Sequence, residues 1–165
     1  MAKPTKHATL ICSIMTVVAL IGIVLGIIFL KPIIIAACLL PAVIYEAYRT
    51  EGESTRWASL VLLIIMILEI VLIAFSVSFD LGEFFGESTK EIAGYTVPLG
   101  DIKIFGPAIM AILSIILFVR TRGKYTKWLA AIIFITCFAI VFSLNPDVFK
   151  QLFKIGVEEG LKNLD

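Results

Sequence analysis

Five long apolar runs constrain this chain more than any other feature of its sequence. They cover about residues 9–30, 33–48, 57–79, 104–119 and 128–144. The hydrocarbon core of a bilayer is about 30 Å thick, and about 20 apolar residues in a helix can cross it. Only 16% of the residues are charged, against about 25% in soluble domains. The sequence therefore predicts an all-α, polytopic integral membrane protein with about five transmembrane helices, which form one domain over residues 1–144.

The first two runs are separated only by Lys31 and Pro32. A single helix over residues 9–48 would be about 60 Å long, which is too long for one crossing. We expect the chain to reverse at Lys31 and Pro32, because proline interrupts a helix. Pro41 predicts a kink in the short second span. The first run is longer than the 7–15 apolar residues of a signal peptide, so we expect it to be retained as a span.

Two short segments between the runs share a sequence pattern. Residues 49–59, RTEGESTRWAS, and residues 120–130, RTRGKYTKWLA, both follow R-T-x-G-x-x-T-[R/K]-W. We expect the arginine to end one helix at the inner membrane surface, the glycine to allow a left-handed turn, the threonine to cap the next helix, and the tryptophan to lie among the headgroups. The equivalent pairs are Arg49 and Arg120, Thr50 and Thr121, Gly52 and Gly123, Thr55 and Thr126, and Trp57 and Trp128. The pattern predicts a first span followed by two tandem helical hairpins; the alternative is convergence, since cytoplasmic turns favour these residue types.

Charge in the short loops predicts the orientation. Residues 120–127 hold four cations and no acid, whereas residues 80–103 hold five acids and two lysines. Because Lys and Arg accumulate in cytoplasmic loops, we expect the N-terminus in the cytoplasm and the C-terminus outside. The sequence has no recognisable organelle-targeting segment, so a prokaryotic plasma (inner) membrane is the simplest location.

Glu69 interrupts the apolar stretch LLIIMILEIVLIAF, residues 62–75. An ionised acid at mid-bilayer costs roughly 2.5–3.5 kcal/mol, so its side chain should face protein or water. We expect Glu69 near the centre of the third span and largely protonated, because no Lys or Arg interrupts another predicted span. It could form an interhelical hydrogen bond, handle protons or cations, or contact another copy. The polar residues expected to join it are Ser76 on its own helix and Thr16, Ser114 and Thr136 on other spans.

Two further features concern packing. Gly22 and Gly26 form a GxxxG motif, which lets another helix approach closely, either within the monomer or between copies. Residues 145–165 begin with Asn145-Pro146-Asp147, which is typical of a helix start. They predict a C-terminal amphipathic helix that lies on the outer membrane surface or against a partner.

No motif of a common catalytic or cofactor site is present. One histidine, His7, and three cysteines in different runs predict neither a metal site nor another cofactor, and no basic block is long enough to bind nucleic acid. We expect a non-enzymatic subunit or scaffold of a membrane complex, whose partners are the lipid bilayer and other membrane proteins or copies of itself. The alternative is a proton- or cation-coupled channel or transporter that uses Glu69. Its position in the repeat pairs with Ile140, so the acid is not duplicated.

Overall fold

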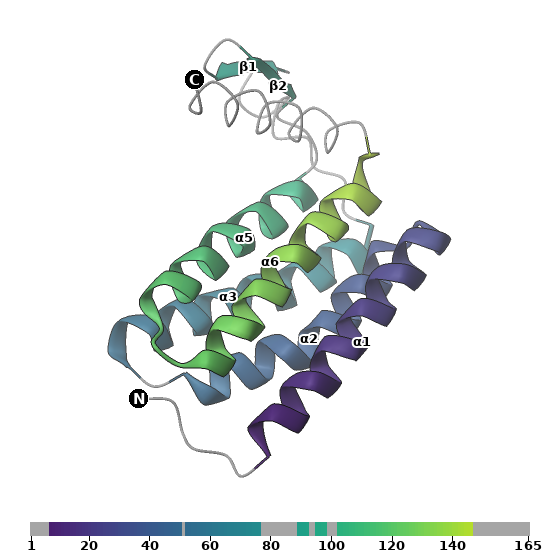
Figure 1. The fold of residues 1–165 in the computed structure, drawn as a ribbon. Helices are drawn as coiled ribbons and strands as arrows, with labels where there is room; N and C mark the ends of the chain where they lie inside the picture. Colours follow the sequence, from purple (N-terminus) through teal and green to yellow (C-terminus); the bar gives the residue numbers. More distant parts are fainter. Residues whose placement is uncertain (1–6, 51, 77–88, 93–94, 99–101, 147–165) are drawn as a thin grey trace, which may run out of the picture.

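Five long helices form an antiparallel bundle (Figure 1). The computed structural model describes residues 7–50, 52–76, 89–92, 95–98 and 102–146. Each of the five helices is long and apolar enough to cross a membrane, in agreement with the predicted multi-pass protein. Their bounds are α1 Ala8–Phe29, α2 Pro32–Arg49, α3 Glu53–Ala74, α5 Ile102–Arg120 and α6 Lys124–Leu144.

The helices α2 and α6 occupy the middle of the bundle. Helix α2 packs against α1, α3 and α6. Helix α6 packs against α1 and α5 as well as α2, and α3 packs against α5. The core between them is formed by large apolar side chains such as Leu39, Met66 and Ile133, which are fully buried. The outward faces are also apolar, with Ile28, Ile64 and others exposed, as expected of helices that contact lipid.

The reversal between the first two spans lies where it was predicted. Leu30 follows α1 in a left-handed conformation with φ 49°, and the Lys31 N–H donates to the Gly26 carbonyl at 3.0 Å. This is the usual way of satisfying the last carbonyls of a helix. Pro32 then occupies the first turn of α2, where its missing N–H has no cost. Helix α2 continues through Pro41.

Four helix boundaries differ from the predicted spans by two or more residues. Helix α3 begins at Glu53, before residue 57, and ends at Ala74, before residue 79. Ser76 adopts a left-handed conformation with φ 50° just beyond this end, and residues 77–79 lie outside the described residues. Helix α5 begins at Ile102 and α6 at Lys124, so residues that precede each apolar run are also helical.

The segment between α3 and α5 contains an antiparallel strand pair that the sequence did not predict. Strand β1, Thr89–Ile92, pairs with β2, Tyr95–Pro98, with Lys90 opposite Val97. At the other end of the chain, Asn145 ends α6 and its N–H donates to the Val141 carbonyl at 2.9 Å. Beyond Pro146, the predicted amphipathic helix of residues 145–165 lies outside the described residues.

Candidate functional site

Glu69 is almost completely buried inside the bundle, with 1% of its surface exposed. It lies in the last third of α3, which runs from Glu53 to Ala74. At 1.5 Å per residue, its Cα is about 24 Å from the start of the helix and about 7.5 Å from the end. The expected position at mid-span is therefore wrong, since α3 starts and ends earlier than its apolar run. Glu69 lies closer to the end of the bundle at which α5 begins.

The carboxyl group of Glu69 packs directly against α5. A Cβ atom on Gly106 would overlap the Glu69 Oε2 atom and lie 3.0 Å from its Cδ atom, so a larger residue at position 106 would displace the carboxyl group. Lys103, half-buried in the first turn of α5, is one helical turn from Gly106, or about 4.5 Å along the axis. Lys103 lies at the edge of the predicted fourth span, so the protonated state of Glu69 stays a prediction.

The four polar residues expected beside Glu69 lie at different depths. Thr16 and Ser114 lie in the halves of α1 and α5 that are far from Glu69, whereas Thr136 lies in the half of α6 at the same end of the bundle as Glu69. Ser76 is exposed beyond the end of α3. The hydroxyls of the other three each donate at 2.7 Å to a carbonyl of their own helix, on Cys12, Ala111 and Ile132 respectively. The hydroxyl protons of these three residues are therefore not donated to Glu69. Of the three, Thr136 is nearest to Glu69 in depth.

A second buried acid, Glu46, was missed in the sequence. It lies in the last turn of α2 with 1% of its surface exposed, next to Arg49 at 6% and Thr50 at 5%. The Thr50 hydroxyl lies 2.9 Å from the Glu46 carbonyl and 3.0 Å from Oε1 of its carboxyl group. Among the described residues, Oε2 of Glu46 has no hydrogen-bond partner. Glu46 was overlooked because an acid beside an arginine at a helix end usually lies in water.

Residues from α1 and α6 complete a polar cluster around Glu46. The guanidinium carbon of Arg49 lies 4.9 Å from the centre of the Tyr125 ring, and Arg49 Nη1 donates to the Tyr45 hydroxyl at 3.2 Å. The hydroxyls of Tyr125 and Thr9 are 2.7 Å apart. These contacts join the start of α1, the end of α2 and the start of α6. We call the end of the bundle at which they meet the turn end, because both repeat turns lie there (Figure 1).

The two repeat turns have the same helix bounds and one shared hydrogen bond. Arg49 and Arg120 end their helices, and α3 and α6 begin at the equivalent residues after them, Glu53 and Lys124. Thr55 donates to the Gly52 carbonyl at 3.2 Å, and Thr126 donates to the Gly123 carbonyl at 2.8 Å. Threonine therefore does not cap an N–H group as predicted; the glycine is the N-cap residue. Only Gly52, with φ 134°, needs a conformation reserved for glycine, since Gly123 has φ −75°.

The equivalent side chains of the two turns lie in different surroundings. Arg120 is exposed, whereas Arg49 is buried beneath Tyr125. Trp57 is 67% exposed, whereas the indole N–H of Trp128 donates to Thr16 Oγ1 at 3.0 Å. Thr50 bonds to Glu46, and Thr121 has no hydrogen-bond partner for its hydroxyl among the described residues. The surroundings differ because α2 ends in the middle of the bundle, whereas α5 ends at its edge.

Gly22 and Gly26 of the GxxxG motif face α2 of the same chain. A Cβ on Gly22 would overlap Cys38, and a Cβ on Gly26 would overlap Ile35. Both glycines are buried. The motif therefore brings α1 and α2 together within the monomer.

The described residues do not include a group of three or more His, Cys, Asp or Glu side chains that could hold a metal ion. Cys12, Cys38 and Cys137 are free thiols on three different helices. No protein-family model, curated protein or solved structure matches this chain.

Proposed function

We propose that this protein is a non-enzymatic subunit or scaffold of a membrane complex. The observation that carries the proposal is how its buried hydroxyls are used. Ser59, Ser114, Thr126 and Thr136 are all buried, and each donates to a carbonyl of its own helix or of that helix's N-cap residue. The one proton of each of these hydroxyls is therefore satisfied within its own helix or at its N-cap and is not available to donate to a substrate. The remaining outward surface is apolar and suits lipid or other transmembrane helices.

The proposed orientation places the turn end in the cytoplasm of a prokaryotic cell. Support comes from Arg120, Arg122, Lys124 and Lys127, which all lie at the turn end. Substituting Arg56 and Arg122 singly with cysteine, in a chain free of other cysteines, tests this orientation. We expect both to react with a membrane-impermeant maleimide only in inverted membrane vesicles. Labelling of both in right-side-out vesicles would reverse the orientation.

Photo-crosslinking in native membranes tests the proposed role as a subunit. A photoreactive residue would replace exposed apolar side chains, one on each helix: Val17, Ile44, Ile64, Ile112 and Ile135. We expect a single protein adduct of constant mass from one or two neighbouring helices, and lipid adducts from the others. Lipid adducts at all five positions would contradict a stable complex.

The second candidate is a proton- or cation-handling protein, and the two buried acids favour it. Glu46 is in the last turn of α2, at the turn end, and Glu69 is in the opposite half of the bundle, so each lies near one membrane surface. The two acids are separated by about 20 Å along the helix axes, which is too far for one hydrogen bond. A proton or cation pathway would therefore require further polar groups between Glu46 and Glu69. Thr136 lies at a depth between the two acids.

Flux measurements on the protein reconstituted alone distinguish the two candidates. For a subunit, we expect no proton or cation flux from the wild type, Glu69→Gln or Glu46→Gln. A pH-dependent flux that Glu69→Gln abolishes would favour the second candidate and contradict the first. Glu69→Leu serves as a control for packing, because it should lower stability more than Glu69→Gln does if the carboxyl group accepts or donates hydrogen bonds.

A further inference from the structure

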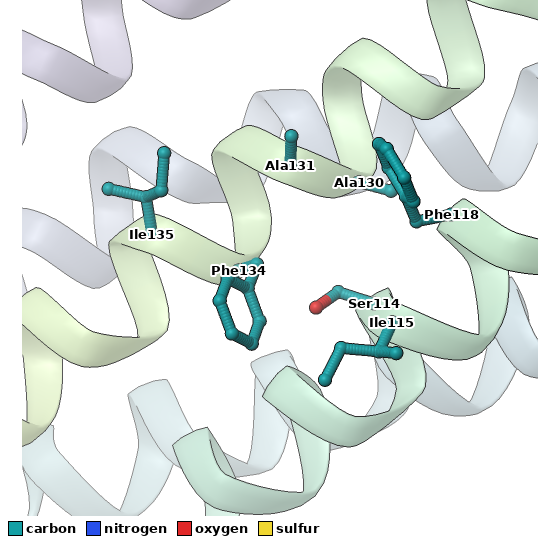
Figure 2. Close-up of a pocket in the computed structure, with 7 residues that line it drawn as sticks. All are labelled: Ser114, Ile115, Phe118, Ala130, Ala131, Phe134 and Ile135. Atoms are coloured by element: carbon teal, nitrogen blue, oxygen red, sulfur yellow. The ribbon is translucent and has the colours of Figure 1, made fainter. Parts of the chain in front are cut away.

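An apolar groove runs between α5 and α6 on the outside of the bundle (Figure 2). Its volume is about 290 Å³. Ser114 and Ala130 form its buried floor, and the ring of Phe118 borders it from α5, as that of Phe134 does from α6. Small residues, Ser114 on α5 and Ala130 and Ala131 on α6, leave this space between the larger side chains.

One end of the groove meets a cluster of positive charge. We call Arg120, Arg122, Lys124 and Lys127 the basic turn. Phe118 lies just before Arg120, and Lys127 Nζ lies 5.5 Å from the centre of the Phe118 ring. The side chains of Arg122 and Lys124 are exposed. The sequence from residue 117 to residue 146 contains no acid.

We propose that the groove holds one acyl chain of an anionic phospholipid, with the phosphate of the lipid at the basic turn. The groove reaches Ile135, near the middle of α6. At 1.5 Å per residue, this residue is about 16 Å from the turn end. This depth of the inner end of the groove is within about one leaflet, which is half of the roughly 30 Å hydrocarbon core. The inference concerns the membrane boundary of the protein, and it does not depend on which partner or ion the bundle serves.

Charge, rather than the apolar lining, selects the lipid. Lipid tails are as apolar as the groove, so the groove alone would not distinguish one phospholipid from another. Each Lys or Arg near an anionic headgroup raises affinity about fivefold. Basic pockets between helices at a membrane surface are a general form of phospholipid site.

The same charge disfavours a second copy of this chain in the groove. In a symmetric pair that meets through one shared surface, each residue near the axis faces its own equivalent or a close neighbour. Two basic turns would then lie side by side, and like charges in contact repel. A phospholipid instead brings a negative charge to this position.

Native mass spectrometry of the delipidated protein in mild detergent tests the proposal. Phosphatidylglycerol and phosphatidylcholine with identical acyl chains would be titrated separately. We expect one phosphatidylglycerol to bind at least ten times more tightly than phosphatidylcholine. In the double variant Arg122→Gln/Lys124→Gln, affinity for phosphatidylglycerol should fall about 25-fold, with little change for phosphatidylcholine. Both substituted side chains are exposed, so this variant should fold normally.

A second variant tests the groove itself. Ala131→Leu introduces the residue found at the equivalent repeat position, Leu60, and should weaken binding of both lipids by partly filling the groove. The matched controls are Arg56→Gln, which removes a cation from the other turn, and Ala74→Leu, which makes the same change on an exposed surface of α3. Both should bind lipid like the wild type.

Three results would overturn the proposal. The first is equal affinity of the wild type for phosphatidylglycerol and phosphatidylcholine. The second is equal binding of phosphatidylglycerol by Arg122→Gln/Lys124→Gln and by Arg56→Gln. The third is a protein dimer that Ala131→Leu dissociates, which would assign the groove to a second copy.

Discussion

The close approach of α1 and α2 predicts a specific coupling between Gly26 and Ile35. A Cβ at position 26 would overlap Cγ1 of Ile35 and lie 2.7 Å from its Cδ1 atom. Carbon atoms in contact are about 3.5–4.0 Å apart, so Cδ1 would have to move by about 1 Å. Ile35 is fully buried, so moving it would displace its neighbours in the core. We therefore expect Gly26→Ala to lower the free energy of unfolding by about 1–3 kcal/mol.

Deleting the obstructing atoms should restore part of this loss. Ile35→Ala alone removes a buried side chain and should cost about 2–5 kcal/mol. In the double variant Gly26→Ala/Ile35→Ala, the overlapping atoms are absent, so the total cost should be smaller than the sum of the two by about 1–3 kcal/mol. Unfolding by SDS in mixed micelles, followed by circular dichroism, would measure all three variants.

Gly22→Ala provides the control for this cycle. Its Cβ would overlap Cys38, one turn away from Ile35 along α2, so Ile35→Ala should not restore its stability. Additive costs at Gly26 and Ile35, or an equal restoration of Gly22→Ala, would refute this packing of α1 on α2.

Three further substitutions test other contacts by the same measurement. Trp128→Phe removes the indole donor to α1 and should cost about 0.6 kcal/mol, whereas the equivalent Trp57→Phe should change nothing measurable; equal costs would argue against the contact. Glu46→Leu should cost about 1–3 kcal/mol more than Glu46→Gln, because only glutamine keeps an oxygen acceptor at this buried position; equal costs would exclude that role. Gly106→Ala should cost about 1–3 kcal/mol by displacing the Glu69 carboxyl group, and less when combined with Glu69→Ala; additivity would place the two side chains apart.

Several predictions that depend on local sequence agree with the structure, although the predicted threonine caps do not. The number of spans followed from the lengths of the apolar runs, and the reversal at Lys31 and Pro32 followed from the length of a helix and the chemistry of proline. The repeated turn pattern predicted two hairpins with equivalent helix bounds, and the bounds at Arg49 and Arg120 match. These features are local, since each depends on residues within one helix or one turn.

Predictions that require knowing which side of a helix faces a neighbour were less successful. The spans are apolar on nearly all sides, so periodicity does not identify the buried face. The depth of Glu69 depended on where α3 ends. The carboxyl group of Glu69 packs against Gly106, which belongs to α5, a separate helix further along the chain. The sequence alone did not show which helix packs against Gly26. In the structure, Ile35 of α2 lies beside it.

The sequence by itself determined five membrane-length helices, the turns between them and the pattern that repeats. Only the tertiary structure decided that Arg49 is buried while Arg120 is exposed, that Glu46 is a second internal acid, and that small residues on α5 and α6 leave a groove. The physical reason is that helix formation depends on neighbours within a few residues. Burial instead depends on where each helix lies in the bundle, which contacts between distant segments establish.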